Sequence, residues 1–138
     1  MEQINVMVDW CGKNYASYIN DPRINGVILS TGKTLDELQR ETEDSLQFHL
    51  ESCIADGDPI PESIKNGEYE LVYEKQVSAI LHEVQQYTTL AAISRVTGIR
   101  HAQLSHYASG RSKPRPRQRE RIMEGLRQIC TSCLALLL

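Results

Sequence analysis

The sequence has little cysteine and no long apolar run, and each absence excludes a class of protein. Its four cysteines are too few and too scattered along 138 residues to form a disulfide scaffold. The longest apolar run, Leu134 to Leu138, is far shorter than the roughly 20 residues that a membrane-spanning helix needs. The first residues alternate apolar and polar side chains and place no apolar core behind a basic segment, so we expect no signal peptide. We therefore expect a cytoplasmic protein that is not associated with a membrane.

The net charge of −3 hides a strong division of charge along the chain. Residues 1–74 hold five Lys/Arg and fifteen Asp/Glu, a net charge of −10, whereas residues 75–138 hold ten Lys/Arg and three Asp/Glu, a net charge of +7. Such a division indicates two modules, of which the basic one meets a polyanion. We therefore expect two domains, 1–74 and 75–138, with the boundary where the sign of the charge and the period of the apolar residues both change.

Residues 1–74 predict a small α+β domain with the order strand, strand, strand, helix, strand. Strands are expected where apolar residues alternate or β-branched residues gather, at residues 3–11, 15–19, 27–29 and 69–73. The helix begins at Thr34, which forms a capping box with Glu37, and ends before Pro59. We expect an antiparallel-type sheet with the helix on one face. Its other face is bare, and must be polar or be covered by a partner.

Residues 75–138 predict an all-α domain. A first, short helix begins near Val77. A second helix is capped by Thr89 and ends at Gly98, where a left-handed residue is needed. A third helix spans about 101–108, and a last helix begins at Pro116 or Arg117. We expect Ala91 and Val96 of the second helix to face inward, with the small Ala91 allowing two helices to cross closely. Ile99 and Leu104 are expected to be buried.

The third helix then presents polar side chains to solvent. The residues expected on or near its exposed side are Arg100, His101, Ala102, Gln103, Ser105 and His106. In a major groove, Gln103 can pair with adenine, the two histidines can bond base edges, and Ala102 can touch a thymine methyl. Five cations flank the helix and suit phosphates: Arg100, Arg111, Lys113, Arg115 and Arg117. The alternative is a helical bundle that merely has a basic face.

Leu104, Ser105, Tyr107 and Gly110 follow the turn as Leu-Ser-x-Tyr-x-x-Gly. In this the segment resembles the lambda-repressor-like (Cro/C1-type) helix-turn-helix, which implies sequence-specific binding of double-stranded DNA. Domains of that type often cap the recognition helix with Ser followed by Gln. This chain has Arg100 and His101 there, so no base preference is carried over.

The N-terminal half carries a second resemblance. Asn14-Tyr15, then Thr31-Gly32-Lys33-Thr34-Leu35-Asp36-Glu37-Leu38, then Phe48-His49-Leu50-Glu51 at a helix end resemble the HicB antitoxin family over roughly residues 4–74. The resemblance implies a partial RNase H-like fold that neutralises a HicA-type mRNA-cleaving toxin, with the complex repressing its own operon. An acidic half would complement a basic toxin. The loop Asp21-Pro22-Arg23-Ile24-Asn25-Gly26 departs from the common Pro-[Gly/Asp]-[Cys/Leu] of the family.

Two other functions stay open. A stand-alone transcriptional regulator would use the N-terminal domain for dimerisation or for another protein partner. A metal-dependent nuclease would have to recruit Asp9 together with Glu41 or Asp44, because that chemistry needs several carboxylates around a divalent metal. No carboxylate on the last strand pairs obviously with them, so we expect no catalytic site, and no metal or cofactor.

Four further features have simple interpretations. Cys130-Thr131-Ser132-Cys133 is a lone CxxC without a second ligand pair, so core or dimer contacts are expected. His49 and Cys53 lie four residues apart and are expected to be buried against the sheet rather than on a metal. Phe48, the only phenylalanine, lies off the apolar stripe and is a candidate partner contact. The apolar tail Leu134–Leu138 indicates association into a dimer or tetramer, because leaving it exposed is costly.

Overall fold

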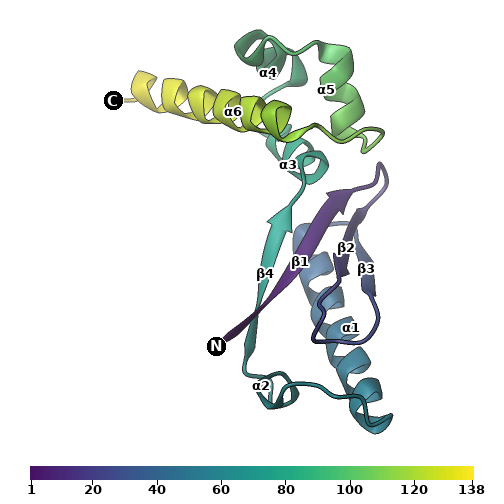
Figure 1. The fold of residues 1–138 in the computed structure, drawn as a ribbon. Helices are drawn as coiled ribbons and strands as arrows, with labels where there is room; N and C mark the ends of the chain where they lie inside the picture. Colours follow the sequence, from purple (N-terminus) through teal and green to yellow (C-terminus); the bar gives the residue numbers. More distant parts are fainter. The chain divides into compact units, whose positions relative to one another are not determined.

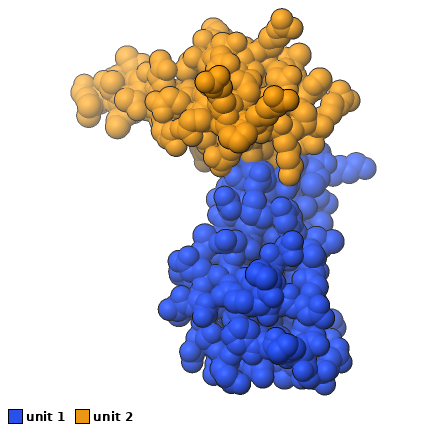
Figure 2. Space-filling model, in the orientation of Figure 1, with its two compact units in different colours: residues 1–76 blue, residues 77–138 orange.

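The computed structural model describes residues 1–138 and divides them into two compact units, unit 1 (residues 1–76) and unit 2 (residues 77–138) (Figure 2). The boundary lies two residues beyond the expected one because the last strand extends to Lys75. A four-stranded sheet and six helices confirm the mixed α+β composition. No helix combines the length and the apolar character that crossing a membrane requires.

Unit 1 is a sheet with a long helix against one face (Figure 1). Its elements are β1 (Glu2–Trp10), β2 (Tyr15–Ile19), β3 (Ile28–Gly32), α1 (Leu35–Ala55), α2 (Glu62–Lys65) and β4 (Tyr69–Lys75). The strand order is β3-β2-β1-β4, in which β2 is antiparallel to both neighbours and β4 is parallel to β1. The expected antiparallel-type sheet is therefore wrong at β4. The physical reason is that α1 carries the chain back along the sheet, so that β4 enters at the opposite edge in the direction of β3 and β1.

Helix α1 is fixed by its cap and by one buried stripe. The Thr34 Oγ1 accepts a hydrogen bond from the Glu37 N–H at 3.1 Å, which confirms the cap. The buried residues recur at helical spacing, as expected: Leu38, Thr42, Leu46, Leu50 and Cys53. In the sheet they meet a core that includes Ile4, Val6 and Val8. The buried Ser17 hydroxyl of β2 lies 2.8 Å from that of Thr42, and so links the sheet to α1. Helix α2, which follows Pro61, was not among the elements expected for residues 1–74.

Unit 2 is all-α. Its helices are α3 (Val77–Val84), α4 (Leu90–Thr97), α5 (His101–Ala108) and α6 (Pro116–Leu136). The core contains Val77, Leu81, Ile93, Ile99, Leu104, Tyr107 and Ile122. Ile99 and Leu104 are thus buried as expected. Ala91 is exposed and Val96 is 37% exposed, so the inward placement of both residues was wrong.

The close approach between helices in unit 2 lies elsewhere. Gly125 of α6 is buried against α4, and a Cβ added there would lie 2.4 Å from the Cγ2 of Thr97. Ala91 cannot take this role because it lies on the outer side of α4. Small residues in the sequence indicate that two helices pack closely, but not which of these residues lies at the contact between the helices.

Candidate nucleic-acid interface

A three-residue turn, residues 98–100, joins α4 to α5. Gly98 ends α4 with φ +74°, a left-handed conformation that residues with a side chain rarely adopt, and its N–H donates to the Ser94 carbonyl at 2.8 Å. Helix-turn-helix motifs join their two helices by turns of this length, often with glycine. The predicted start and end of α5 and the glycine cap are both confirmed.

Hydrogen bonds from two side chains stabilise this turn, and they were not predicted from the sequence. The Ser94 hydroxyl donates to the Ile99 carbonyl at 2.6 Å. The Thr97 hydroxyl donates to the Ile93 carbonyl at 2.7 Å and accepts from the Ile99 N–H at 3.2 Å. These bonds satisfy polar groups that a tight turn would otherwise leave unpaired. The available signal was a small hydroxyl residue four positions before the turn glycine.

Arg121 of α6 closes the same end of α4. Its guanidinium donates to the Thr97 carbonyl at 2.6 Å and to the Gln118 side chain at 2.9 Å. A cation at the last carbonyls of a helix also opposes the negative end of the helix dipole. Arg121 was counted only as one basic residue among ten, because nothing local marks a contact that spans 24 residues.

Two buried side chains set the rotation of α5. Leu104 and Tyr107 face the core, so His101, Ala102 and Ser105 face solvent. Arg100, the residue before the helix, is also exposed and provides no side-chain cap. The first N–H groups of α5 therefore have no side-chain acceptor from this position, which is the arrangement in which a helix N-terminus accepts a phosphate.

Gln103 and His106 lie at the border of that exposed face. Both are half-buried. The Gln103 amide donates to the Ser112 hydroxyl at 3.4 Å, and the Arg111 guanidinium donates to the His106 Nε2 at 3.3 Å. Of the six residues predicted for the exposed side, these two form hydrogen bonds with the loop after α5. To bond a base, either must exchange its loop contact for the base edge.

The predicted phosphate contacts gather around the start of α6. The side chains of Lys113, Arg115 and Arg117 are exposed and form no ion pair or side-chain hydrogen bond, as is also true of the Arg100 side chain. Arg115 precedes α6 without a side-chain cap, and Pro116 occupies the first turn. By contrast, Arg127 pairs with Glu120 at 3.2 Å and Glu124 at 3.3 Å, two of the three acids after residue 76. The loop and the start of α6 thus keep a concentration of unpaired positive charge.

Unit 1 does not bring together the carboxylates that a nuclease would need. Asp9 alternates with the buried Val8 on β1, and so lies on the face away from α1, which carries Glu41 and Asp44. No group of three His, Cys, Asp or Glu side chains is arranged to hold a metal ion. His49 and Cys53 instead approach one carbonyl, that of Asn25, at 2.5 and 3.9 Å.

Three apolar features of the sequence are left on the surface. Phe48 is 76% exposed on α1. Cys130 and Cys133 are both exposed, so the core contact expected for them was wrong and only an intermolecular contact remains open. The tail Leu134–Leu138 is exposed throughout, because α6 extends past the last core residue of unit 2 (Figure 1).

Comparisons with protein-family models, with curated proteins and with solved structures found no match to this chain.

Proposed function

We propose that unit 2 binds a specific operator in double-stranded DNA, with α5 in the major groove and residues 111–117, at the end of the loop and the start of α6, on the phosphates. The observation that carries the proposal is the three-residue turn with its left-handed Gly98, which leaves the polar side of α5 exposed beside unpaired cations. A helix of about 10–12 Å diameter matches the major groove, and base contacts there distinguish all four base pairs. The cations position the protein without reading sequence.

We propose that the protein binds its operator as a homo-oligomer, with a dimer as the basic unit, formed through the end of α6. Cys130, Cys133, Leu134 and Leu137 recur at i, i+3, i+4 and i+7, and therefore lie on one side of the helix. Leu134 is 60% and Leu137 82% exposed. Residues 128–138 carry no charged side chain, so a second copy of the same stripe is a complementary partner. A two-fold dimer contacts two half-sites about one helical turn apart, or a multiple of it.

We infer that unit 1 provides the antitoxin activity. Its residues hold six Lys/Arg and fifteen Asp/Glu, a net charge of −9. The HicB resemblance supports a HicA-type ribonuclease toxin as the partner, and an acidic surface favours association with a basic one. In this scheme the protein masks the toxin, and the complex represses its own operon.

The test uses the full chain and the product of any short reading frame beside its gene. Co-expression should restore growth that the neighbouring product alone arrests, and the two proteins should co-purify. If no neighbouring product is toxic or binds, the antitoxin proposal fails. Operator binding is then scored by itself in a gel shift with upstream DNA, and its survival would favour a stand-alone regulator.

A further inference from the structure

One edge of the unit 1 sheet lacks the charges that normally protect a sheet edge. Strands β3 and β4 are the two edges. Strand β4 carries Glu70, Glu74 and Lys75, whereas residues 27–32 read Val-Ile-Leu-Ser-Thr-Gly without a charge or a proline. An exposed, uncharged and β-branched edge is a ready template for another strand. The two edges of one sheet thus differ in the feature that decides whether a further strand can add.

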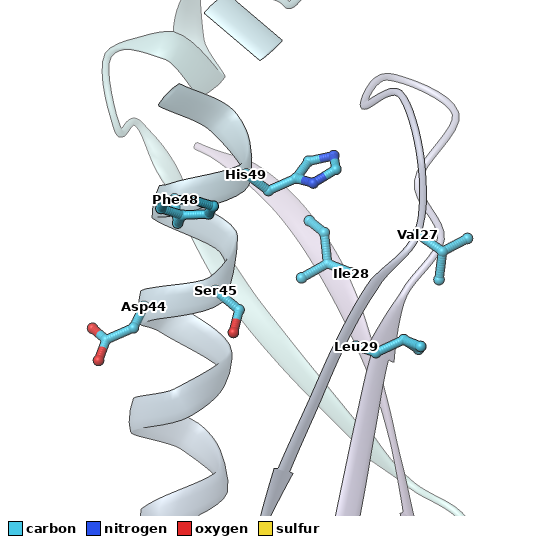
Figure 3. A pocket seen from close by; sticks show the side chains of 7 residues that line it. All are labelled: Val27, Ile28, Leu29, Asp44, Ser45, Phe48 and His49. Atoms are coloured by element: carbon cyan, nitrogen blue, oxygen red, sulfur yellow. The ribbon is translucent and has the colours of Figure 1, made fainter. Parts of the chain in front are cut away.

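Exposed apolar side chains lie on both sides of the β3 backbone. Leu29 is 72% exposed and continues a cross-strand row, Met7–Tyr18–Leu29, on the face away from α1. Phe48 of α1 lines a shallow hollow beside β3, where the Ile28 side chain points toward the helix and those of Val27 and Leu29 point away from it (Figure 3). Successive side chains of an added strand point to opposite faces. One set would therefore pack beside Leu29 and the other against Phe48.

The edge is held in place before any partner arrives. The His49 Nε2 donates to the Asn25 carbonyl at 2.5 Å. Gly26 has φ +90°, and a Cβ there would lie 3.2 Å from the His49 ring. The turn that leads into β3 is therefore packed on α1. A preformed edge reduces the ordering cost of binding.

We propose that β3 accepts an extended segment of a basic protein as a fifth strand, with apolar side chains over Leu29 and Phe48 and cations toward α1. The identity of that protein as the toxin rests on the proposed antitoxin function. Glu41 and Asp44 are exposed and, with Phe48, recur at i, i+3 and i+7 on α1. Asp44 lines the apolar hollow itself, and Glu41 lies about one helical turn before it on the same side of the helix. A second copy of this chain would bring the same carboxylates and another −9 unit against them. Charge complementarity therefore favours a basic partner.

The test follows amide hydrogen exchange along the full chain, with and without the neighbouring toxin product. Binding should protect residues 27–32 and leave β4 unchanged. Val27→Lys with Leu29→Lys should weaken binding about tenfold or more, because it places charges on an apolar contact and repels cations. Val72→Lys, on the opposite edge, is the matched control and should bind like the parent. Both altered edge side chains are exposed, and circular dichroism checks that each variant folds.

The outcomes separate the two proposals. If the toxin binds but the β3 amides stay unprotected and the double variant binds normally, the edge proposal is overturned while the antitoxin proposal stands. If no toxin exists, a short synthetic peptide that alternates valine and lysine replaces it, with a valine–glutamate peptide as control. Protection of β3 by the lysine peptide alone supports the proposal, and protection by neither overturns it. Concentration-dependent protection of β3 in the free chain would assign the edge to a second copy and overturn it as well.

Discussion

Gly125 on α6 lies directly against Thr97 on α4, since a Cβ on Gly125 would lie 2.4 Å from the Thr97 Cγ2. Thr97 cannot easily move, because its hydroxyl bonds the Ile93 carbonyl and the Ile99 N–H inside the turn. We predict that Gly125→Ala lowers the free energy of unfolding of unit 2 by about 1–3 kcal/mol through overpacking. Chemical denaturation measures it. Ser132→Ala, on the exposed part of α6, is the control and should change stability by less than about 0.5 kcal/mol. Equal stability of the Gly125 variant and the parent would contradict the close contact.

A second prediction separates base reading from phosphate binding. Gln103→Ala should relax the preference at one base pair by about 1–3 kcal/mol, if the amide leaves Ser112 for a base. Arg115→Ala should weaken binding to all sequences alike and reduce the slope of log affinity against log salt by about one. Arg127→Ala is the control, because its guanidinium is paired with Glu120 and Glu124. Competition binding over a set of single-base operator variants measures all three. An unchanged preference in the Gln103 variant would remove that residue from base reading.

A third prediction concerns the end of α6. Leu134→Glu with Leu137→Glu places charges on the exposed apolar stripe and should convert the proposed dimer to a monomer, because two like-charged stripes repel and lose their apolar contact. Light scattering after size-exclusion chromatography gives the mass. Ser132→Glu lies about opposite the stripe by helical angle and should leave the dimer intact. A parent protein that is already monomeric at high concentration would rule out this surface for a second copy.

A fourth prediction is a dependence on alkaline pH. The Tyr73 hydroxyl is buried without a hydrogen-bond partner, and burial, with a smaller contribution from Glu43, raises the pKa of Tyr73 from 10.0 to about 12. Because the folded pKa lies above the unfolded one, the stabilisation is complete below about pH 10 and is lost as pH rises toward 12. Tyrosinate absorbance should show a late-titrating group that Tyr73→Phe removes. At neutral pH that variant should be at least as stable as the parent, since it deletes an unpaired polar group. A titration unchanged by the substitution would contradict the assignment.

Local signals predicted much of the secondary structure. Thr34 and Thr89 cap their helices, and Gly98 is left-handed, because a cap depends only on residues within one helical turn. The strand 15–19 and the helix 101–108 were predicted with their observed bounds. The predictions that were wrong concern features that depend on residues far away in the sequence. The pairing of β4 with β1 joins segments about 67 residues apart, and no periodicity encodes its direction.

The sequence predicted which residues of α5 are exposed better than it predicted the contacts that their side chains make. The exposed positions of α5 followed from the burial of Leu104, which a 3.6-residue period predicts. The contacts of Gln103 with Ser112 and of Arg121 with Thr97 depend on how a loop and α6 return to the motif. The sequence also did not predict that β3 is an edge strand, because its position at the edge follows from the strand order and not from its own residues.

Fluorescence anisotropy of the full chain on its own upstream DNA, at low and moderate salt, would test DNA binding through α5. We compare the parent with Ser105→Glu, which places a carboxylate on the exposed face of α5, and with Gln128→Glu, which adds the same charge on α6. We predict that the parent prefers upstream DNA over a scrambled duplex, and that Ser105→Glu loses about tenfold or more in affinity while Gln128→Glu does not. Equal binding by all three proteins, or no preference of the parent for the upstream duplex, would contradict sequence-specific DNA binding through α5.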